Sequence, residues 1–139
     1  MSEDCIFCRV SAGTTPVNIV AETPDALAFM DINQPTPGHV LVIPRVHVQD
    51  IYELDEELAA SVFKLTVQVA KAVKLALAPD GLDLLQANEG AGQQSVFHFH
   101  MHVLARYLGD RDRVRLGWQS NFPTHAELER MAEEIRAAL

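Results

Sequence analysis

The sequence predicts an α+β fold in which an antiparallel sheet carries one long helix and one C-terminal helix. Short apolar stretches of strand length come first, and a long helical pattern follows them along the chain. Strands and helices grouped in this way are typical of an antiparallel sheet with helices on one face. With 139 residues, of which 48% are hydrophobic, the chain has the size of one domain with one core, so we expect residues 1–139 to form a single domain.

The first strands are indicated by short apolar segments between turn residues. Asn18–Ala21 and Ala26–Met30 are separated by a turn containing Pro24, which suggests a β-hairpin. The segment Asn33–Gly38 holds two prolines and a glycine and is expected to be a loop. His39–Pro44 then reads as a buried strand, because it is a β-branched apolar run.

A long amphipathic helix is predicted after Asp55, a residue type that often caps the start of a helix. Apolar residues recur at spacings of three and four until Pro79. They are Leu58, Val62, Leu65, Val69, Ala72, Val73 and Ala76.

The remaining elements are two more strands and a second helix. Leu82–Gln86 reads as a strand, the polar segment Asn88–Gly92 as a loop, and a last strand is expected to begin near Ser95. Thr124 and Glu127 have the spacing of a capping box. They predict a C-terminal helical extension over about residues 120–139, whose apolar side would carry Leu128, Met131, Ala132, Ile135 and Leu139.

Composition excludes some classes of partner. The chain has 19 acidic and 11 basic residues and a formal net charge of −8, which disfavours nucleic acid as a partner because that affinity depends on Lys and Arg. A small anionic substrate is compatible with this charge, since backbone N–H groups and imidazolium neutralise charge locally. No apolar stretch has membrane-spanning length, and the start Met-Ser-Glu-Asp-Cys has no signal pattern. We therefore expect a cytoplasmic protein without a membrane partner.

The most informative segment is His98-Phe-His100-Met-His102-Val-Leu, where histidines alternate with apolar residues. In a strand, residues two apart share a face, so the three imidazoles would point one way and the apolar side chains the other. On a helix the first and second of them would be splayed by about 200°. The pattern therefore predicts a strand that presents three imidazoles together.

Two kinds of chemistry fit such a row of histidines. A lone histidine in an apolar strand is usually a hydrogen-bonded structural residue. Three histidines within five residues of a strand are costly to bury, so a purely structural role does not explain them. One functional interpretation is a three-histidine metal site that leaves a position open for water. The other is nucleophilic catalysis by one ring that its neighbours orient.

Cys5 and Cys8 have the spacing of half a zinc site, and six histidines could complete it. The histidines are His39, His47, His98, His100, His102 and His125. A redox-active pair is a weaker alternative because only four residues precede Cys5, and a pair of buried thiols is another. A closed Cys₂His₂ site would hold the fold together without acting on substrate.

Taken together, these motifs resemble the histidine triad (HIT) family. The similarity covers the triad itself, Cys5-Ile-Phe-Cys8, Phe29-Met-Asp31-Ile32, the segment Pro35–His47, Asn88 and Gln94-Ser95, in the family's order. It extends over about residues 4–107, which would form the core of the HIT domain. The segment Gly92-Gln93-Gln94 departs from the usual Gly-Gln pair and puts the geometry of this loop in doubt.

The resemblance implies a Hint-like fold in which a five-stranded antiparallel sheet continues across a homodimer. It also implies a hydrolase of purine nucleoside phosphoramidates or dinucleoside polyphosphates, which derive from AMP or GMP. The nucleotidyl group would pass to His100 and then to water, and no catalytic metal would be required. The phosphoramidase branch is the preferred one.

The same resemblance assigns roles to the other site residues. His39 would lie close to the His100 ring and help to set its protonation, and His102 and Ser95 would donate hydrogen bonds to phosphate oxygens or to the departing group. The nucleotide-binding residues would be Asp31 at the ribose, Ile32 and Phe29 at the base, and the Asn88 loop and Gln94 near the α-phosphate. Asp31 could instead cap a turn and Ile32 could be core. A structural Zn²⁺ would be held by Cys5, Cys8, His47 and His98, while His125 would be a surface residue.

Two other functions stay open at this point. The chain could be a nucleotide-binding regulatory or adaptor protein with vestigial hydrolysis, or a metallohydrolase that uses the triad as ligands. The sequence does not decide among them.

Overall fold

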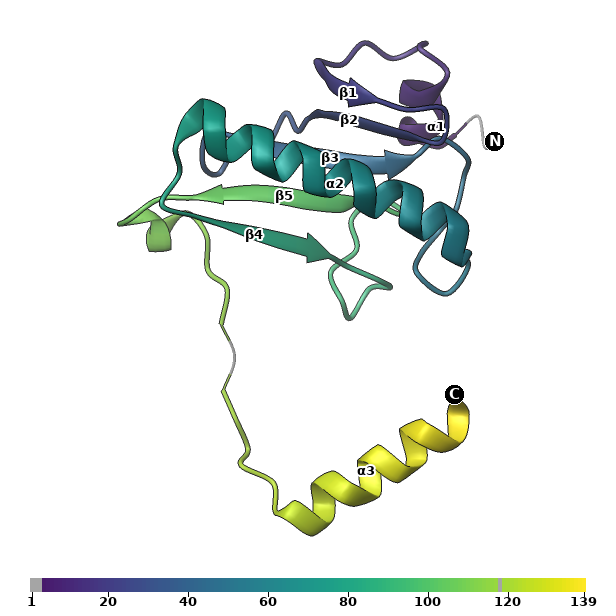
Figure 1. Ribbon diagram of the computed structural model, residues 1–139, viewed down its shortest axis with the longest axis vertical. Helices are drawn as coiled ribbons and strands as arrows, with labels where there is room; N and C mark the ends of the chain where they lie inside the picture. The colour runs from purple at the N-terminus through teal and green to yellow at the C-terminus, as the bar shows by residue number, and fades with distance from the viewer. Residues whose placement is uncertain (1–3, 118) are drawn as a thin grey trace.

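The computed structural model describes residues 4–117 and 119–139 and contains one five-stranded antiparallel sheet in the order β1-β2-β3-β5-β4 (Figure 1). The strands are β1 (Ile19–Glu22), β2 (Ala26–Met30), β3 (His39–Pro44), β4 (Gly81–Gln86) and β5 (Met101–Arg106). The helices are α1 (Ile6–Ser11), α2 (Glu56–Leu77), the short 3₁₀ helix η1 (Asp110–Asp112) and α3 (His125–Ala138). The predicted α+β class, the five antiparallel strands and both predicted helices are confirmed.

The register of the sheet brings the two parts of the expected site together. His39 at the start of β3 pairs with Leu104 of β5, and Leu41 pairs with His102. On its other side β3 pairs with β2 from Val40 to Pro44, so that Phe29 faces Leu41. Residues far apart in sequence are thereby fixed side by side in the middle of the sheet.

Helix α2 lies across one face of the sheet, as Figure 1 shows, and packs there to form the main core. Asp55 caps the helix by accepting a hydrogen bond from the Leu58 N–H, and the helix ends at Ala78 in a left-handed conformation before Pro79. Within the predicted apolar stripe Val62, Leu65, Val69 and Val73 are buried, whereas Ala72 and Ala76 are exposed. A smaller apolar cluster lies around Phe7 and Phe29 and also holds Val10, Leu27, Leu41 and Ile43.

The prediction that the last strand begins near Ser95 was wrong, because β5 begins at Met101. Residues 96–98 bend instead of joining the ladder, and the Phe99 N–H donates to the Val48 carbonyl at 2.6 Å. The alternation of side chains nevertheless continues. Phe99 and Val103 are buried in the α2 core, whereas Phe97, which lies before this tether, is 53% exposed and is not a core residue.

Helix α3 is capped as predicted, since the side chains and backbones of Thr124 and Glu127 form a reciprocal capping box. Figure 1 shows it at the end of an extended segment, well away from the sheet. Its apolar residues Leu128, Met131 and Ile135 are exposed, and so is His125, as expected. Among residues 4–117 and 119–139, no helix is both long and apolar enough to span a membrane.

The stability of this fold should depend on the buried side of α2. Leu65 is 2% exposed in the main core, whereas Leu75 of the same helix is 87% exposed. Leu65→Ala removes buried methyl groups and leaves a cavity, so we expect a loss of about 2–5 kcal/mol in the free energy of unfolding, measured with urea. Leu75→Ala is the matched control and should change it by less than about 0.5 kcal/mol. Equal losses in both variants would contradict the placement of α2.

Candidate functional site

Four side chains from three separate parts of the chain converge on one point. Cys5 and Cys8 belong to the start of α1, His47 follows β3, and His98 precedes β5. Their ligand atoms all lie within 4.8 Å of one another. The shortest distances join Cys8 Sγ to His47 Nδ1 at 3.3 Å and Cys5 Sγ to His98 Nδ1 at 3.4 Å. The structure thus selects two of the six histidines as partners of the cysteines.

This geometry fits a tetrahedral zinc ion. Bond lengths of about 2.3 Å to sulfur and about 2.0 Å to nitrogen place the two ligand atoms about 3.5 Å apart. The third sulfur–nitrogen distance, from Cys8 Sγ to His98 Nδ1, is 3.6 Å. His98 Nε2–H donates to the Pro44 carbonyl at 2.9 Å, which leaves the lone pair on Nδ1, the atom that faces the sulfurs. The four residues therefore form a possible metal-binding group.

The middle triad histidine is held in one tautomer. His100 is buried, and its Nδ1–H donates to the His98 carbonyl at 2.8 Å. In the neutral ring this hydrogen bond places the lone pair on Nε2. The ring of His100 meets that of His102 edge-on, with centroids 4.9 Å apart. His100 thus has a free nucleophilic nitrogen, and its protonated nitrogen is bonded to the backbone.

The direct side-chain neighbour of His39 in the triad is His102. The rings of His39 and His102 are stacked with centroids 5.1 Å apart, and His39 Nε2 lies 2.9 Å from His102 Nδ1. His39 Nδ1 lies 2.7 Å from the Asn33 carbonyl, which accepts its hydrogen, and 3.5 Å from a carboxylate oxygen of Asp31. The expectation that His39 lies close to the His100 ring and helps to set its protonation stays a prediction, and the contribution of His39 to the lowered pKa of His100 agrees with it.

Asp31 caps a turn, which is one of the two roles expected for this residue. Its Oδ1 accepts from the Asn33 N–H at 2.8 Å, so it caps the turn that begins the proline-rich loop. Ile32 is fully exposed, which excludes the core interpretation, and leaves an apolar side chain beside Asp31 in contact with solvent.

An aromatic residue that sequence reasoning missed lies at the centre of the site. The ring of Phe7, between the two cysteines, meets Phe29 edge-on at 5.6 Å and His100 at 5.3 Å. Helix α1 was not predicted, because six residues are too few to show an amphipathic period. The one available signal was Cys5, which caps the helix through its sulfur.

The loop before the triad is braced by its own side chains. Gln94 is buried, donates to the Gln49 and Val96 carbonyls and accepts from the Glu89 N–H. Asn88 accepts from the Ile51 N–H and exchanges hydrogen bonds with Gln86. These two predicted nucleotide-binding side chains therefore hold the loop in place, whereas Ser95 is exposed.

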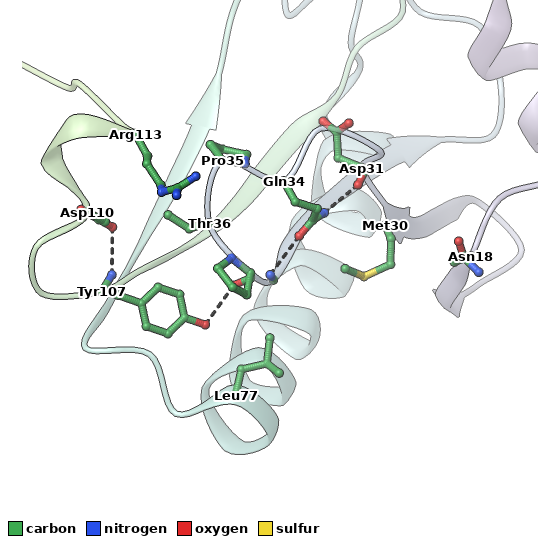
Figure 2. Close-up of a pocket in the computed structure, with 12 residues that line it drawn as sticks. Asn18, Met30, Asp31, Gln34, Pro35, Thr36, Leu77, Tyr107, Asp110 and Arg113 are labelled. Carbon is green, nitrogen blue, oxygen red and sulfur yellow. Dashed lines mark hydrogen bonds between the residues drawn. The ribbon is translucent and has the colours of Figure 1, made fainter.

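A second brace, also missed from the sequence, shapes the loop before β3. Gln34 donates to the Asp31 and His39 carbonyls and accepts from two backbone N–H groups, as Figure 2 shows in part. Gly38 has φ +99°, and a Cβ there would lie 2.6 Å from a methyl of Leu77. Against this loop lies a cavity of about 920 Å³ lined by residues such as Met30, Thr36 and Tyr107. It includes Asp31 but none of the triad histidines, so it is not the reactive centre.

Burial keeps the triad neutral. It lowers the pKa of His102 to about 4, with smaller contributions from His100 and His39. The pKa of His98 is lowered to about 4, again mainly by burial, although its hydrogen bond to Pro44 opposes the shift. Burial also lowers the pKa of His100. At neutral pH all three rings therefore carry a lone pair that can bind a metal, a proton or phosphorus.

These shifts predict how stability depends on pH. Unfolded histidine takes up a proton near pH 6.5, whereas folded His102 does so only near pH 4. The unfolded state thus binds more protons between these values, and the free energy of unfolding should fall as the pH is lowered from 6.5 to 4. In urea unfolding at pH 7, 6 and 5, the free energy of unfolding should fall less steeply with pH in His102→Gln than in the parent protein. The difference in slope should correspond to at most one bound proton. His125→Gln, which removes an exposed ring, is the control, and an unchanged slope in His102→Gln would contradict the assignment.

Comparison with known proteins identifies the family. The HIT domain pattern matches residues 12–109. Adenosine 5'-monophosphoramidase hnt1 of Schizosaccharomyces pombe is 33% identical over 97% of this chain and 98% of its own. A crystal structure of a HIT family protein from Bacillus anthracis superposes with a TM-score of 0.93 at 38% identity, covering 100% of this chain and 99% of its own. A zinc-bound histidine triad family protein from Mycobacterium smegmatis gives a TM-score of 0.74 at 29% identity, covering 98% of each chain. With the fold, the triad and the cysteine pair in place, this chain belongs to the HIT family.

Proposed function

We propose that the protein hydrolyses purine nucleoside phosphoramidates through a covalent nucleotidyl intermediate on His100, with dinucleoside polyphosphates as the alternative substrate class. In the first step His100 Nε2 attacks the α-phosphorus. The bond from phosphorus to the leaving amine breaks, and the amine departs with its electron pair. In the second step water attacks phosphorus, the P–N bond to His100 breaks, and a nucleoside monophosphate is released.

The observation that carries this proposal is the hydrogen bond from His100 Nδ1–H to the His98 carbonyl, 2.8 Å long. It fixes the tautomer in which Nε2 is the nucleophile and holds the ring in one direction. Because burial keeps the ring neutral, the lone pair is available at physiological pH. A nucleophile of this kind needs no metal, which agrees with a separate metal-binding group made from other residues.

His102 is suited to move the proton that the leaving group needs. Its Nδ1 is engaged with His39 at 2.9 Å, so its Nε2 remains for substrate. The negative charge of a bound phosphate raises the pKa of a neighbouring imidazole. Protonated His102 then gives its proton to the departing amine and recovers one from the attacking water. Asp31, 3.5 Å from the far nitrogen of His39, stabilises positive charge on this pair.

The nucleoside would lie on the apolar side of the same site. Phe29 packs under it within the small cluster, and the exposed Ile32 follows Asp31, which we assign to the ribose hydroxyls. The phosphate would be held by Ser95 and by backbone N–H groups of the Asn88–Gly92 loop, which Gln94 braces. The relative named adenosine 5'-monophosphoramidase supports the phosphoramidate class. A Zn²⁺ ion would be held apart from the nucleotide by Cys5, Cys8, His47 and His98, and it would connect α1 to the sheet and to the triad segment.

The covalent intermediate provides the decisive test. Incubation with a slowly hydrolysed adenosine phosphoramidate should add one nucleoside monophosphate to the protein, visible by mass spectrometry on the peptide that contains His100. His100→Ala should lose the adduct and slow turnover by at least about a thousandfold, because the nucleophile is gone. His125→Ala, which changes an exposed histidine outside the site, should form the adduct like the parent protein.

The other two functions make different predictions in the same experiment. Equal, feeble turnover in the parent and in His100→Ala, with equal nucleotide binding, would show an adaptor and overturn the proposal. Turnover that is lost on chelation while thermal stability stays unchanged would show a metallohydrolase and also overturn it.

We further propose that two copies join into one continuous sheet at β4. The sheet has two edges, and β1 is short and interrupted by a register shift between Ile19 and Ala21. Such irregularity protects an edge from further pairing. By contrast β4 pairs with β5 without interruption from Gly81 to Gln86 and has its other side open within the described chain. A two-fold pairing of β4 strands would cover that edge.

Sedimentation equilibrium tests the dimer and its edge together. Leu84 is a partly exposed residue of β4, so Leu84→Glu would place like charges near one another across the two-fold axis and should give a monomer. Val20→Glu makes the same change on the other edge strand and should stay dimeric. A monomeric parent protein, or a dimer lost only in Val20→Glu, would contradict this assignment.

A further inference from the structure

One aromatic ring connects the metal-binding group to the reactive histidine. Phe7 lies between Cys5 and Cys8 in sequence and is buried. Its ring meets His98 edge-on, with centroids 5.8 Å apart, and meets His100 in the same manner at 5.3 Å. The position of Phe7 therefore restricts the ring of the proposed nucleophile directly.

A second connection runs through the backbone of His98. The side chain of this residue approaches Cys5 Sγ at 3.4 Å and Cys8 Sγ at 3.6 Å. Its carbonyl accepts the hydrogen bond from His100 Nδ1. A shift of His98 would move the acceptor that fixes the tautomer of His100.

Helix α1 has few other means of staying in place. It has six residues, which is too short for a helix to be stable by itself in water. Its buried side chains are Phe7, Cys8 and Val10, and Phe7 and Val10 pack in the small cluster of six buried residues. A metal ion bound to both cysteines and to two histidines of the main body would therefore decide how firmly Phe7 is held.

We infer that occupancy of this metal group positions the nucleophile, and that Phe7 is the positioning residue that carries the effect to His100. The metal then does more than hold the fold together, because its loss frees α1, Phe7 and the His98 carbonyl at once. His100 loses its fixed tautomer and direction while the sheet remains folded. This inference rests on the proposed role of His100.

The test compares the zinc-loaded and metal-free forms of the full chain by two measurements. Histidine side-chain ¹⁵N NMR reports the tautomer of His100, and mass spectrometry reports the rate of adduct formation with an adenosine phosphoramidate. Zinc-loaded parent protein should show one His100 tautomer, protonated at Nδ1. The metal-free form should show a mixture and react about 10- to 100-fold more slowly, the usual effect of losing an outer-shell partner.

Variants separate positioning from simple bracing. Zinc-loaded Phe7→Ala should keep its metal yet show a mixture of His100 tautomers and a lower rate. Metal removal should then have a smaller effect than in the parent protein, because the coupling through Phe7 is already lost and only the connection through the His98 carbonyl remains. Val10→Ala shortens another buried side chain of α1 in the same cluster and should keep the full response to zinc. A metal-free parent with one tautomer and an unchanged rate would overturn the inference, as would a full zinc response in Phe7→Ala.

If Phe7→Ala does not fold, Phe7→Leu takes its place in the comparison. Zinc-loaded Phe7→Leu, which keeps an apolar side chain, should show the mixed tautomer at unchanged zinc content, and a single tautomer there would overturn the inference. If no form of the protein produces an adduct, the proposed function fails, whereas the NMR comparison still decides whether the metal positions His100.

Discussion

The fully buried His98 is the point on which the rest of the site depends. Its Nε2–H is bonded to the end of β3 through Pro44, its Nδ1 faces the two cysteines of α1, and its carbonyl holds His100. A neutral imidazole has one donor and one acceptor, and here both have partners. One residue therefore connects three segments that are far apart in the sequence, and each connection restricts the other two.

The three triad histidines make different contacts because of strand geometry. Side chains on one side of residues 98–102 point to α1 and the site, whereas Phe99 and Met101 face the α2 core. The hydrogen bond from the Phe99 N–H to Val48 keeps this alternation going beyond the end of the ladder. The first histidine is thus set at the metal group and the third at His39. The middle one lies between them, with no hydrogen bond to another side chain among residues 4–117 and 119–139.

Most of the fold was predictable because its signals are local. The first four strand-length apolar runs, the helix over residues 56–77 and the Thr124 capping box all appeared in the structure close to the positions expected. The site was predictable in its members but not in its contacts. Six histidines were equal candidates as ligands by spacing alone, and the choice of His47 and His98 came from family resemblance. Tertiary structure decides such a choice, as it decides that His39 contacts His102.

The errors have physical causes as well. Helix α1 is shorter than two helical periods, so it leaves no periodic signal. The late start of β5 depends on a single tether to Val48, 51 residues away, which no local pattern reveals. Gln94 and Asn88 carry polar groups suited to a ligand, yet neighbouring backbone and side-chain groups use those groups first.

The two-residue repeat of the triad also determines which genetic changes the segment can survive. Replacing one side chain alters one function and leaves the neighbours in register. Inserting or deleting a single residue between His98 and His102 would instead invert the faces of everything beyond it. Imidazoles beyond the change would be directed at the α2 core and apolar side chains at the candidate site, so the triad would no longer present its histidines together. The spacing of this segment should therefore be far less variable in length than the loops on either side of it.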